Sequence, residues 1–283
     1  MSVKILWISD FCLKHTKGGA QRSDDIIIQQ GLKNGLDITW FNHDSDPSIL
    51  DQKYDHVIST NLEQISKTSP HLLNWLQYHP NHSRLEHDMN NYLSPNDRQL
   101  LFSNCKNTFF LTQYHHSLFV NLYGDLFKNV KILQDPIDTG LFFDQGLERE
   151  DKVLYAGFMH MLKGTEGFFN YVIQNPDIEF VVAGWGSPLY EFLATSIPNV
   201  EFLGTVDYSA MPDLYNKYKE IMYHPLINEP FCRSIGEALL CGIHVNTSAG
   251  KIGCIEECSR IGIDKFKENC ATAAEDFWKI INT

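Results

Sequence analysis

The residues with the clearest chemical potential lie in segment 228–242, which reads NEPFCRSIGEALLCG. Glu229 stands just before an expected helix, and Glu237 lies roughly one or two turns inside it. A helix N-terminus presents unpaired N–H groups and a positive dipole end, which suit a phosphate. Ionised carboxylates accept hydrogen bonds from hydroxyls, as sugar recognition requires. An acidic helix start can also simply complement the dipole, so the spacing alone leaves both interpretations open.

A second candidate group is Lys163 in segment 155–164, YAGFMHMLKG. The segment follows an expected buried strand, turns at Gly157 and presents the lysine ahead of a helix that should begin near Thr165 or Glu166. A lysine in this position can neutralise a diphosphate. An ordinary exposed lysine is the alternative interpretation.

Glycines follow a strand at two further places. Gly184 and Gly186 come after the strand expected at 178–183, and Gly18-Gly19 come after the first strand. Glycines there allow the backbone to approach a ligand closely, or simply make a tight turn. Neither place has a complete G-x-G-x-x-G fingerprint, which argues against an enzyme that uses a nicotinamide dinucleotide.

Short β-rich runs alternate with amphipathic stretches along almost the whole chain. The expected strands are Val3–Ile8, Ile38–Phe41, His56–Ser59, Ser83–His87, Thr108–Leu111, Val130–Leu133, Val153–Ala156, Ile178–Ala183, Val200–Leu203, Ile221–Tyr223 and Ile243–Asn246. The expected helices are Ala20–Asn34, Pro70–Tyr78, Pro95–Ser103, Tyr114–Tyr123, Glu166–Gln174, Pro188–Ala194, Met211–Lys217, Ile235–Cys241 and Phe266–Ile281. This alternation predicts an α/β protein with parallel sheets covered by helices on both faces.

The stretch 134–151 lacks periodicity and is rich in turn residues, which is typical of a linker. We therefore expect two Rossmann-like, doubly wound domains that face a cleft, with ligands beyond the carboxyl ends of the strands. The first domain comprises residues 1–134 and the second residues 135–264. The helix in residues 265–283 is expected to pack back on the first domain.

Composition narrows the class of protein further. The formal net charge of −12 over 283 residues opposes nonspecific binding to nucleic acid or anionic lipid. No apolar run approaches the about 18 residues of a membrane helix, and the N-terminus does not resemble a signal peptide, so we expect a cytoplasmic protein without membrane insertion. The spacing of the cysteines and histidines indicates no metal site.

Taken together, the motifs resemble the retaining glycosyltransferases of family 4 (glycosyl transferases group 1), which have the two-domain GT-B fold. The similarity is strongest over Lys131–Glu257 and includes the interdomain-like stretch from Asp135 to Phe142. It is weaker over residues 1–130, where 17–22 (KGGAQR) and 86–88 (EHD) are the matching islands. The resemblance implies an enzyme that transfers a sugar from a nucleotide sugar to an acceptor.

The resemblance also implies roles for residues of the second domain. Lys163 would bind the donor phosphates, Glu237 the donor ribose, and Glu229 the hydroxyls of the transferred sugar. The backbone amides expected near the sugar and the diphosphate are those of Phe231, Cys232 and Arg233.

Other implied donor contacts are spread over both domains. Gly204 and Thr205 would run beside the nucleobase. Gly18 and Gly19 would close over the donor from the first domain. His87 would lie near the reacting sugar and position the donor, without acting as a nucleophile.

One position departs from the family pattern. The family commonly has an arginine directly after the glycine of the first motif, where it is paired with the lysine on the diphosphate, and this chain has Phe158 there. Losing one well-placed donor can cost roughly 10²–10³ in rate, so a compensating cation is expected. Arg233 is the candidate.

The implied chemistry needs no cofactor and no metal, since lysine, arginine and helix-end amides can stabilise the departing diphosphate. The donor is expected to be a UDP- or GDP-sugar, transferred with retention to a saccharide or a lipid-linked glycan. The nucleobase, the sugar, the acceptor and the oligomeric state remain open.

Three other functions fit the same motifs. A phage-type DNA glycosyltransferase would act on a hydroxymethylated base, using a local groove with cations from Lys14, Lys17, Arg22, Arg84 and Arg98, and segment 90–96 would line the acceptor side. A sugar-nucleotide epimerase would need no acceptor. A non-catalytic sugar-nucleotide binder would explain Phe158.

Overall fold

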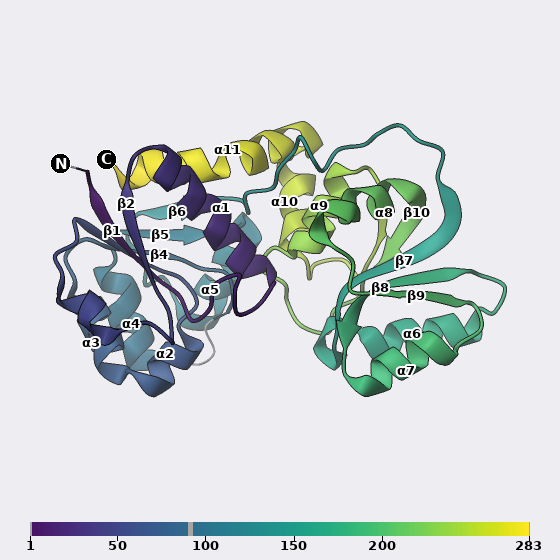
Figure 1. The fold of residues 1–283 in the computed structure, drawn as a ribbon, viewed down its shortest axis with the longest axis horizontal. Helices are drawn as coiled ribbons and strands as arrows, with labels where there is room; N and C mark the ends of the chain where they lie inside the picture. The colour runs from purple at the N-terminus through teal and green to yellow at the C-terminus, as the bar shows by residue number, and fades with distance from the viewer. Residues whose placement is uncertain (1, 90–92, 283) are drawn as a thin grey trace. The chain divides into compact units, whose positions relative to one another are not determined.

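The computed structural model describes residues 2–89 and 93–282 and comprises two compact units (Figure 1). The first unit contains Met1–Pro136 and Asp264–Thr283, and the second contains Ile137–Ile263. The sequence instead places its divisions after residues 134 and 264. Each unit is a separate parallel sheet with helices on both faces.

The sheet of the first unit has the strand order β2-β1-β3-β4-β5-β6. Its strands are β1 (Lys4–Ile8), β2 (Asp37–Phe41), β3 (His56–Ser59), β4 (His82–Leu85), β5 (Asn107–Phe110) and β6 (Val130–Ile132). All pairings are parallel. The chain winds from β1 to β2 on one side and then to β3 on the other, so the topological switch point lies between β1 and β3.

Six helices accompany this sheet in the described residues: α1 (Gly19–Lys33), α2 (Glu63–Thr68), α3 (Pro70–Tyr78), α4 (Pro95–Asn104), α5 (Gln113–Tyr123) and α11 (Ile263–Ile281). Local sequence explains several of their ends. Ser94 caps α4 by accepting a hydrogen bond from the Asp97 amide, and Thr112 caps α5 by accepting one from the His115 amide. Helices α1 and α11 cover one face of the sheet, and α2, α3 and α4 cover the other (Figure 1).

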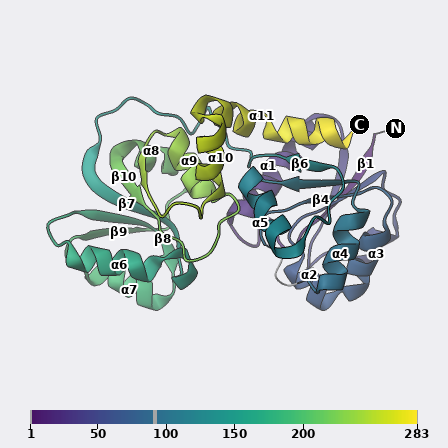
Figure 2. The same cartoon turned by 180° about the vertical axis from the view of Figure 1, so that it is seen from behind.

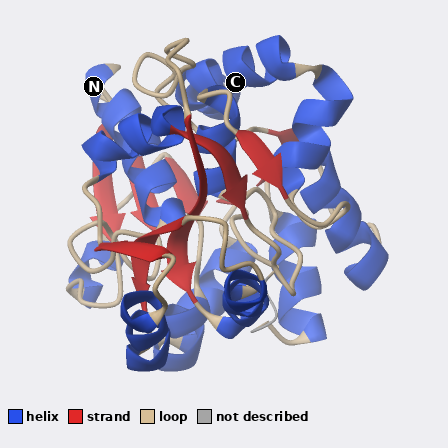
Figure 3. Ribbon diagram, turned by 90° about the vertical axis from the view of Figure 1, so that its right-hand side faces the viewer, coloured by secondary structure: helices blue, strands red, loops and turns tan. Residues whose placement is uncertain are grey.

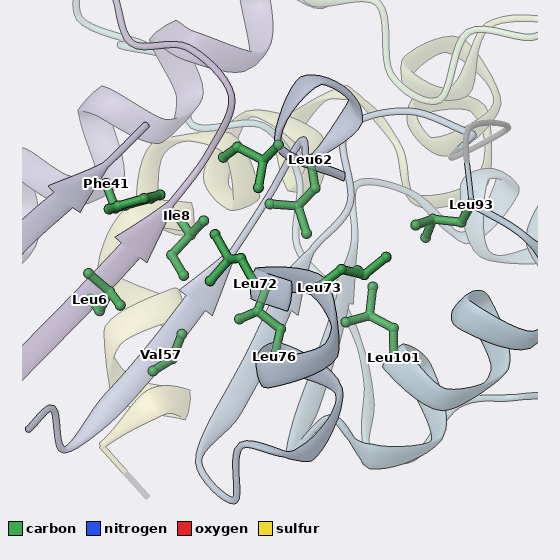
Figure 4. Close-up of a cluster of buried hydrophobic side chains, with 11 residues drawn as sticks. Leu6, Ile8, Phe41, Val57, Leu62, Leu72, Leu73, Leu76, Leu93 and Leu101 are labelled. Carbon is green, nitrogen blue, oxygen red and sulfur yellow. The ribbon is translucent and has the colours of Figure 1, made fainter. Parts of the chain in front are cut away.

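Strand β1 places large apolar side chains on both faces of the sheet, so both faces must be covered by helices. Leu6 and Ile8 point to one face and pack in a leucine-rich cluster with Leu76 of α3 (Figure 4). Trp7 points to the opposite face and contacts Trp278 of α11, with ring centroids 6.2 Å apart. Nε1 of Trp278 also donates to the carbonyl of Ile27 in α1 at 2.6 Å, so the C-terminal helix is part of the first unit.

The sheet of the second unit has the order β11-β10-β7-β8-β9, again with parallel pairings only. Its strands are β7 (Glu150–Met159), β8 (Phe180–Gly186), β9 (Val200–Gly204), β10 (Tyr218–Met222) and β11 (His244–Asn246). The chain winds from β7 through β8 to β9 and then returns to β10 on the other side of β7. The switch point of this unit therefore lies between β7 and β10.

Helices cover both faces of the second sheet as well (Figures 2 and 3). They are α6 (Thr165–Gln174), α7 (Pro188–Ser196), α8 (Met211–Lys217), α9 (Arg233–Leu240) and α10 (Gly253–Ile261). Helices α6 and α7 lie on one face, and α8, α9 and α10 lie on the other. Among the helices that the structure describes, none combines the length and the apolar composition needed to span a bilayer.

The α/β class and the two doubly wound sheets confirm the sequence-based expectation. Two helices were not predicted, α2 and α10, and strand β7 begins at Glu150, inside the stretch interpreted as linker. The strand expected at Ser83–His87 ends earlier, at Leu85, so His87 lies in the loop that follows β4. Helix α2 has only six residues, too few for a clear periodic pattern. Helix α10 is amphipathic, so its signal was present in the sequence and was missed.

Candidate functional site

The loop after β7 and the loop after β10 lie against each other at the switch point of the second unit. Leu226 donates from its amide to the carbonyl of Leu162 at 2.9 Å. Gly164 has a φ of +78°, and a Cβ built on it would lie 1.9 Å from the carbonyl oxygen of His224. Only glycine permits both this conformation and this close approach. The backbones of the two loops are therefore in contact, and Lys163 lies between Leu162 and Gly164, the residues that make this junction.

Lys163 and Glu229 are in direct contact across this junction. Nζ of Lys163 lies 2.5 Å from Oε1 of Glu229, and the hydroxyl of Tyr223 donates to the same oxygen at 2.9 Å. The lysine side chain is 31% exposed, and that of the glutamate is 9% exposed. For Oε2 of Glu229, the described residues provide no protein donor, so this oxygen can accept from the hydroxyl of a ligand.

The backbone around Glu229 fixes its position before α9 begins. The amide of Glu229 donates to the carbonyl of Lys251 at 2.8 Å, and the Gly253 amide donates to the Glu229 carbonyl at 2.9 Å. Cys232, the N-cap of α9, has a φ of 68°, which is uncommon for a residue with a Cβ. The expected arrangement, with Glu229 before the helix and Glu237 inside it, is the observed one.

The second acidic residue belongs to a buried ion pair on α9. Nε of Arg233 donates to Oε1 of Glu237 at 2.9 Å, and the hydroxyl of Tyr208 donates to the same oxygen at 2.8 Å. Burial, followed by the neighbouring Glu237 carboxylate, raises the pKa of Tyr208 above its usual value. The Glu237 carboxylate is thereby held between the Arg233 guanidinium and the Tyr208 hydroxyl.

Two tyrosines of this site were missed from sequence. Tyr208 and Tyr223 each donate to one of the two key glutamates. Tyr223 stands just beyond β10, in the segment that sequence predicts as a strand, whereas Tyr208 begins the short 3-10 helix Tyr208–Ala210. Tyr223 could have been found from sequence, because it ends an expected strand in the region where ligands bind. No sequence pattern indicates a role for Tyr208.

The other residues predicted to contact the donor also lie in the second unit, and their surroundings differ. Phe231 is buried and packs on Gly236, where an added Cβ would lie 2.7 Å from its ring. Burial raises the pKa of the Cys232 thiol to about 12, so this cysteine is a neutral thiol near pH 7. Gly204 ends β9 with a φ of +64°, and Thr205 after it is exposed.

The first unit contains three predicted residues. Gly18 is the N-cap of α1 and Gly19 is its first residue. His87 is buried, and its Nε2 lies 2.9 Å from Oδ1 of Asp24 on α1. The other Asp24 oxygen accepts from the hydroxyl of Thr60 at 2.9 Å. Burial would lower the pKa of His87, but Asp24 and further carboxylates raise it to about 9.

Two further expectations concern metals and the acceptor. Across residues 2–89 and 93–282, no three histidine, cysteine, aspartate or glutamate side chains are grouped as metal ligands. Of the segment 90–96 suggested for the acceptor, residues 90–92 lie outside the described residues. Metal independence and the acceptor remain predictions.

The second unit thus brings a lysine, two glutamates and an arginine to the carboxyl edge of a parallel sheet. One cation and one carboxylate meet at the switch point, and a second pair follows in the first turns of α9. This edge is where open α/β sheets bind ligands. A phosphate can replace Glu229 as the partner of Lys163, and hydroxyls can bind the carboxylates.

Two Rossmann-like parallel sheets, each covered by helices on both faces, define the GT-B fold of glycosyltransferases. Residues 141–259 match the model of the family described as glycosyl transferases group 1. The matched segment lies within the second unit and contains Lys163, Glu229, Arg233 and Glu237. Among curated proteins, none matches this chain.

Solved structures support the fold over nearly the full length of the chain. HepE from Anabaena, in complex with UDP and glucose, is 15% identical, with a TM-score of 0.63 over 97% of this chain and 94% of that chain. Sucrose-phosphate synthase from Thermosynechococcus elongatus is 13% identical, with a TM-score of 0.71 over 99% and 96% of the two chains. AviGT4, a glycosyltransferase involved in avilamycin A biosynthesis, is 13% identical, with a TM-score of 0.62 over 99% and 97%.

Proposed function

We propose that this protein is a retaining glycosyltransferase of family 4 that transfers a sugar from a UDP- or GDP-sugar to a saccharide or a lipid-linked glycan. The observation that carries the proposal is the contact between Lys163 and Glu229 at the switch point of the second unit. The matched family segment includes both residues. The similar HepE structure contains UDP and glucose, a nucleotide and a sugar of the proposed type.

In this proposal, different residues of the second unit bind different parts of the donor. Lys163 leaves Glu229 and neutralises the diphosphate, whose negative charge grows as the sugar departs. Glu229 then accepts from hydroxyls of the transferred sugar. Glu237, held by Arg233 and Tyr208, accepts from the hydroxyls of the ribose.

Retention follows in this proposal from attack on the same face that the diphosphate leaves. The departing phosphate takes the proton of the acceptor hydroxyl, so no carboxylate nucleophile and no metal are required. His87 is proposed to act as a hydrogen-bond donor that positions the sugar, because a pKa of about 9 keeps its ring protonated near pH 7. Protonated histidine is a poor general base.

Arg233 remains the proposed source of the second positive charge that Phe158 does not provide. Its Nε donates to Glu237 and its Nη2 donates to the Tyr208 hydroxyl at 3.2 Å, so a guanidinium that also reaches the diphosphate would share these N–H groups or exchange a partner. Replacing Arg233 with lysine keeps the positive charge and removes the planar arrangement of several N–H donors that a guanidinium has. A loss of diphosphate affinity in Arg233→Lys would support the double role.

The function is tested by incubating the protein with UDP-, GDP-, ADP- and dTDP-glucose without an acceptor. Slow release of a nucleoside diphosphate is expected with UDP- or GDP-glucose, because water can replace the acceptor hydroxyl. NMR of the freshly formed glucose should show the donor's anomeric configuration. Release of the opposite anomer would contradict retention.

A non-catalytic sugar-nucleotide binder is the second candidate, because Phe158 replaces the cation that commonly pairs with the lysine. Such a protein would bind the donor and release no nucleoside diphosphate. Binding measured by calorimetry, together with unchanged donor after prolonged incubation, would identify it.

A further inference from the structure

Phe158 and Trp185 are register partners at the carboxyl ends of β7 and β8. Because side chains alternate along a strand, both rings project from the same face of the sheet. The next pair toward the sheet interior on that face is Ala156 and Ala183, whose side chains are small and buried. Phe158 and Trp185 are each 43% exposed, so both rings are open to solvent at this edge.

A third ring, that of His160, extends this pair. The ring centroids of Phe158 and His160 are 5.6 Å apart with an interplanar angle of 13°, and those of Phe158 and Trp185 are 5.7 Å apart at 41°. The histidine is held in place, because its Nδ1 accepts from the Leu162 amide at 3.2 Å and its backbone bonds twice to the Thr165 hydroxyl. Phe158, His160 and Trp185 together form an ordered, exposed aromatic platform.

Polar groups border the aromatic platform on two sides. Glu191, in the first turn of α7, accepts from the amide of Gly186 at 3.2 Å, next to Trp185. Lys163 lies at the end of the short 3-10 helix Met161–Lys163 that His160 caps. The platform therefore adjoins Lys163 of the proposed donor site through this short helix, and Glu191 supplies a carboxylate beside Trp185 that can accept from hydroxyls.

We propose that the aromatic platform stacks against the apolar face of a pyranose ring in a neutral saccharide acceptor, an inference that rests on the proposed function. A pyranose has a C–H face that suits an aromatic ring and an equatorial belt of hydroxyls that suits bordering carboxylates. The formal net charge of −12 disfavours a polyanionic occupant such as nucleic acid. Phe158, which replaces a cation of the family pattern, thereby adds contact area for an uncharged ring.

The test uses maltotriose, cellotriose and xylotriose as probes in saturation-transfer NMR with the full chain and saturating UDP. At least one probe should bind, with its ring C–H protons receiving the strongest transfer. Phe158→Ala and Trp185→Ala should each weaken that binding on the order of 2- to 10-fold, because each removes one stacking ring. Trp185→Tyr should restore most of it. Phe192→Ala, an exposed aromatic residue on α7, is the matched control and should change nothing.

The outcomes separate the platform from the proposed function. UDP affinity in the two platform variants should equal that of the wild type. Failure of all three saccharides to bind, or equal binding by wild type and both alanine variants, would overturn the proposal. Loss of UDP-glucose affinity with UDP affinity intact would assign the rings to the donor sugar and overturn the acceptor assignment. Failure of every nucleoside diphosphate to bind would count instead against the proposed function.

Discussion

Nζ of Lys163 and Oε1 of Glu229 lie 2.5 Å apart and join the loop after β7 to the loop after β10. In this arrangement the cation and the carboxylate satisfy each other. In the proposed function, a diphosphate that binds Lys163 would release the carboxylate for the hydroxyls of a sugar. The proposal therefore expects this one pair to contact both the diphosphate and the sugar of the donor.

Glu229→Gln should retain the fold and reduce nucleoside diphosphate release on the order of 10²- to 10³-fold. The amide keeps the shape of the side chain but loses the charge that accepts strongly from Lys163 and from sugar hydroxyls. The assay is donor hydrolysis at saturating donor. Glu201→Gln on β9 is the matched control, since Glu201 is an exposed carboxylate that pairs with Lys152, and this variant should hydrolyse the donor normally. Equal rates in both variants would remove Glu229 from the site.

Tyr208→Phe should weaken nucleoside diphosphate binding about 3- to 10-fold, the usual worth of one hydrogen bond. The hydroxyl donates to Glu237 at 2.8 Å and accepts from Arg233 at 3.2 Å, so its removal loosens the carboxylate that is proposed to bind the ribose. Calorimetric titration measures the change. Tyr171→Phe, on the surface of α6, should bind like the wild type. An affinity in Tyr208→Phe equal to that control would mean that Glu237 does not contact the nucleotide.

Gly164→Ala should destabilise the protein by several kcal/mol, because the backbone is at positive φ and the new Cβ would overlap the carbonyl of His224. Gly167→Ala is the matched control for this substitution. Gly167 lies inside α6 with nothing within 4 Å of its added Cβ, so this variant should gain roughly 0.5–1 kcal/mol from helix propensity. Urea unfolding measures both changes. A Gly164→Ala variant as stable as the wild type would contradict the close approach of the two loops.

The buried pair of His87 and Asp24 should make stability depend on pH. The pKa of His87 is raised from 6.5 to about 9, so the folded protein holds a proton that the unfolded chain releases between these values. The contribution of this group is complete below pH 6.5 and is lost as pH rises through 9. It amounts to about 3 kcal/mol over that window.

The measurement is the free energy of unfolding at several pH values between 6 and 10. Asp24→Asn removes the charge that faces the imidazole and should flatten the fall in stability between pH 6.5 and 9. Asp25→Asn, the neighbouring residue on α1, should leave the slope unchanged. Parallel profiles in wild type and Asp24→Asn would contradict the claim that Asp24 raises the pKa of His87.

Much of the architecture could be predicted from sequence because its signals are local. Strand β3 and helices α3 and α8 have the predicted bounds, where apolar runs and proline at the helix start are strong. The parallel sheets follow from the alternation of strand and helix along most of the chain. Sequence placed Lys163 in the turn after a strand and Glu229 just before a helix, and the parallel topology explains why these two residues, far apart in sequence, meet.

The side-chain contacts between residues far apart in sequence could not be predicted, because they depend on the directions in which the side chains point. The partnership of Tyr208 with Glu237 and of Asp24 with His87 joins different elements, and no periodicity links them. Phe158 was interpreted as a lost arginine. Its exposed ring contact with Trp185 depends on the register of β7 against β8, which only the structure specifies.

The central claim is that Lys163 binds the diphosphate of the donor. It is tested most directly by calorimetric titration of wild type, Lys163→Ala and Lys152→Ala with whichever of UDP, GDP, ADP and dTDP binds the wild type most tightly. Lys152, on the same strand β7, pairs with Glu179 and Glu201 on the surface and serves as the control. The account predicts a Kd raised about 10- to 100-fold in Lys163→Ala and unchanged in Lys152→Ala. The same Kd in all three proteins would contradict it.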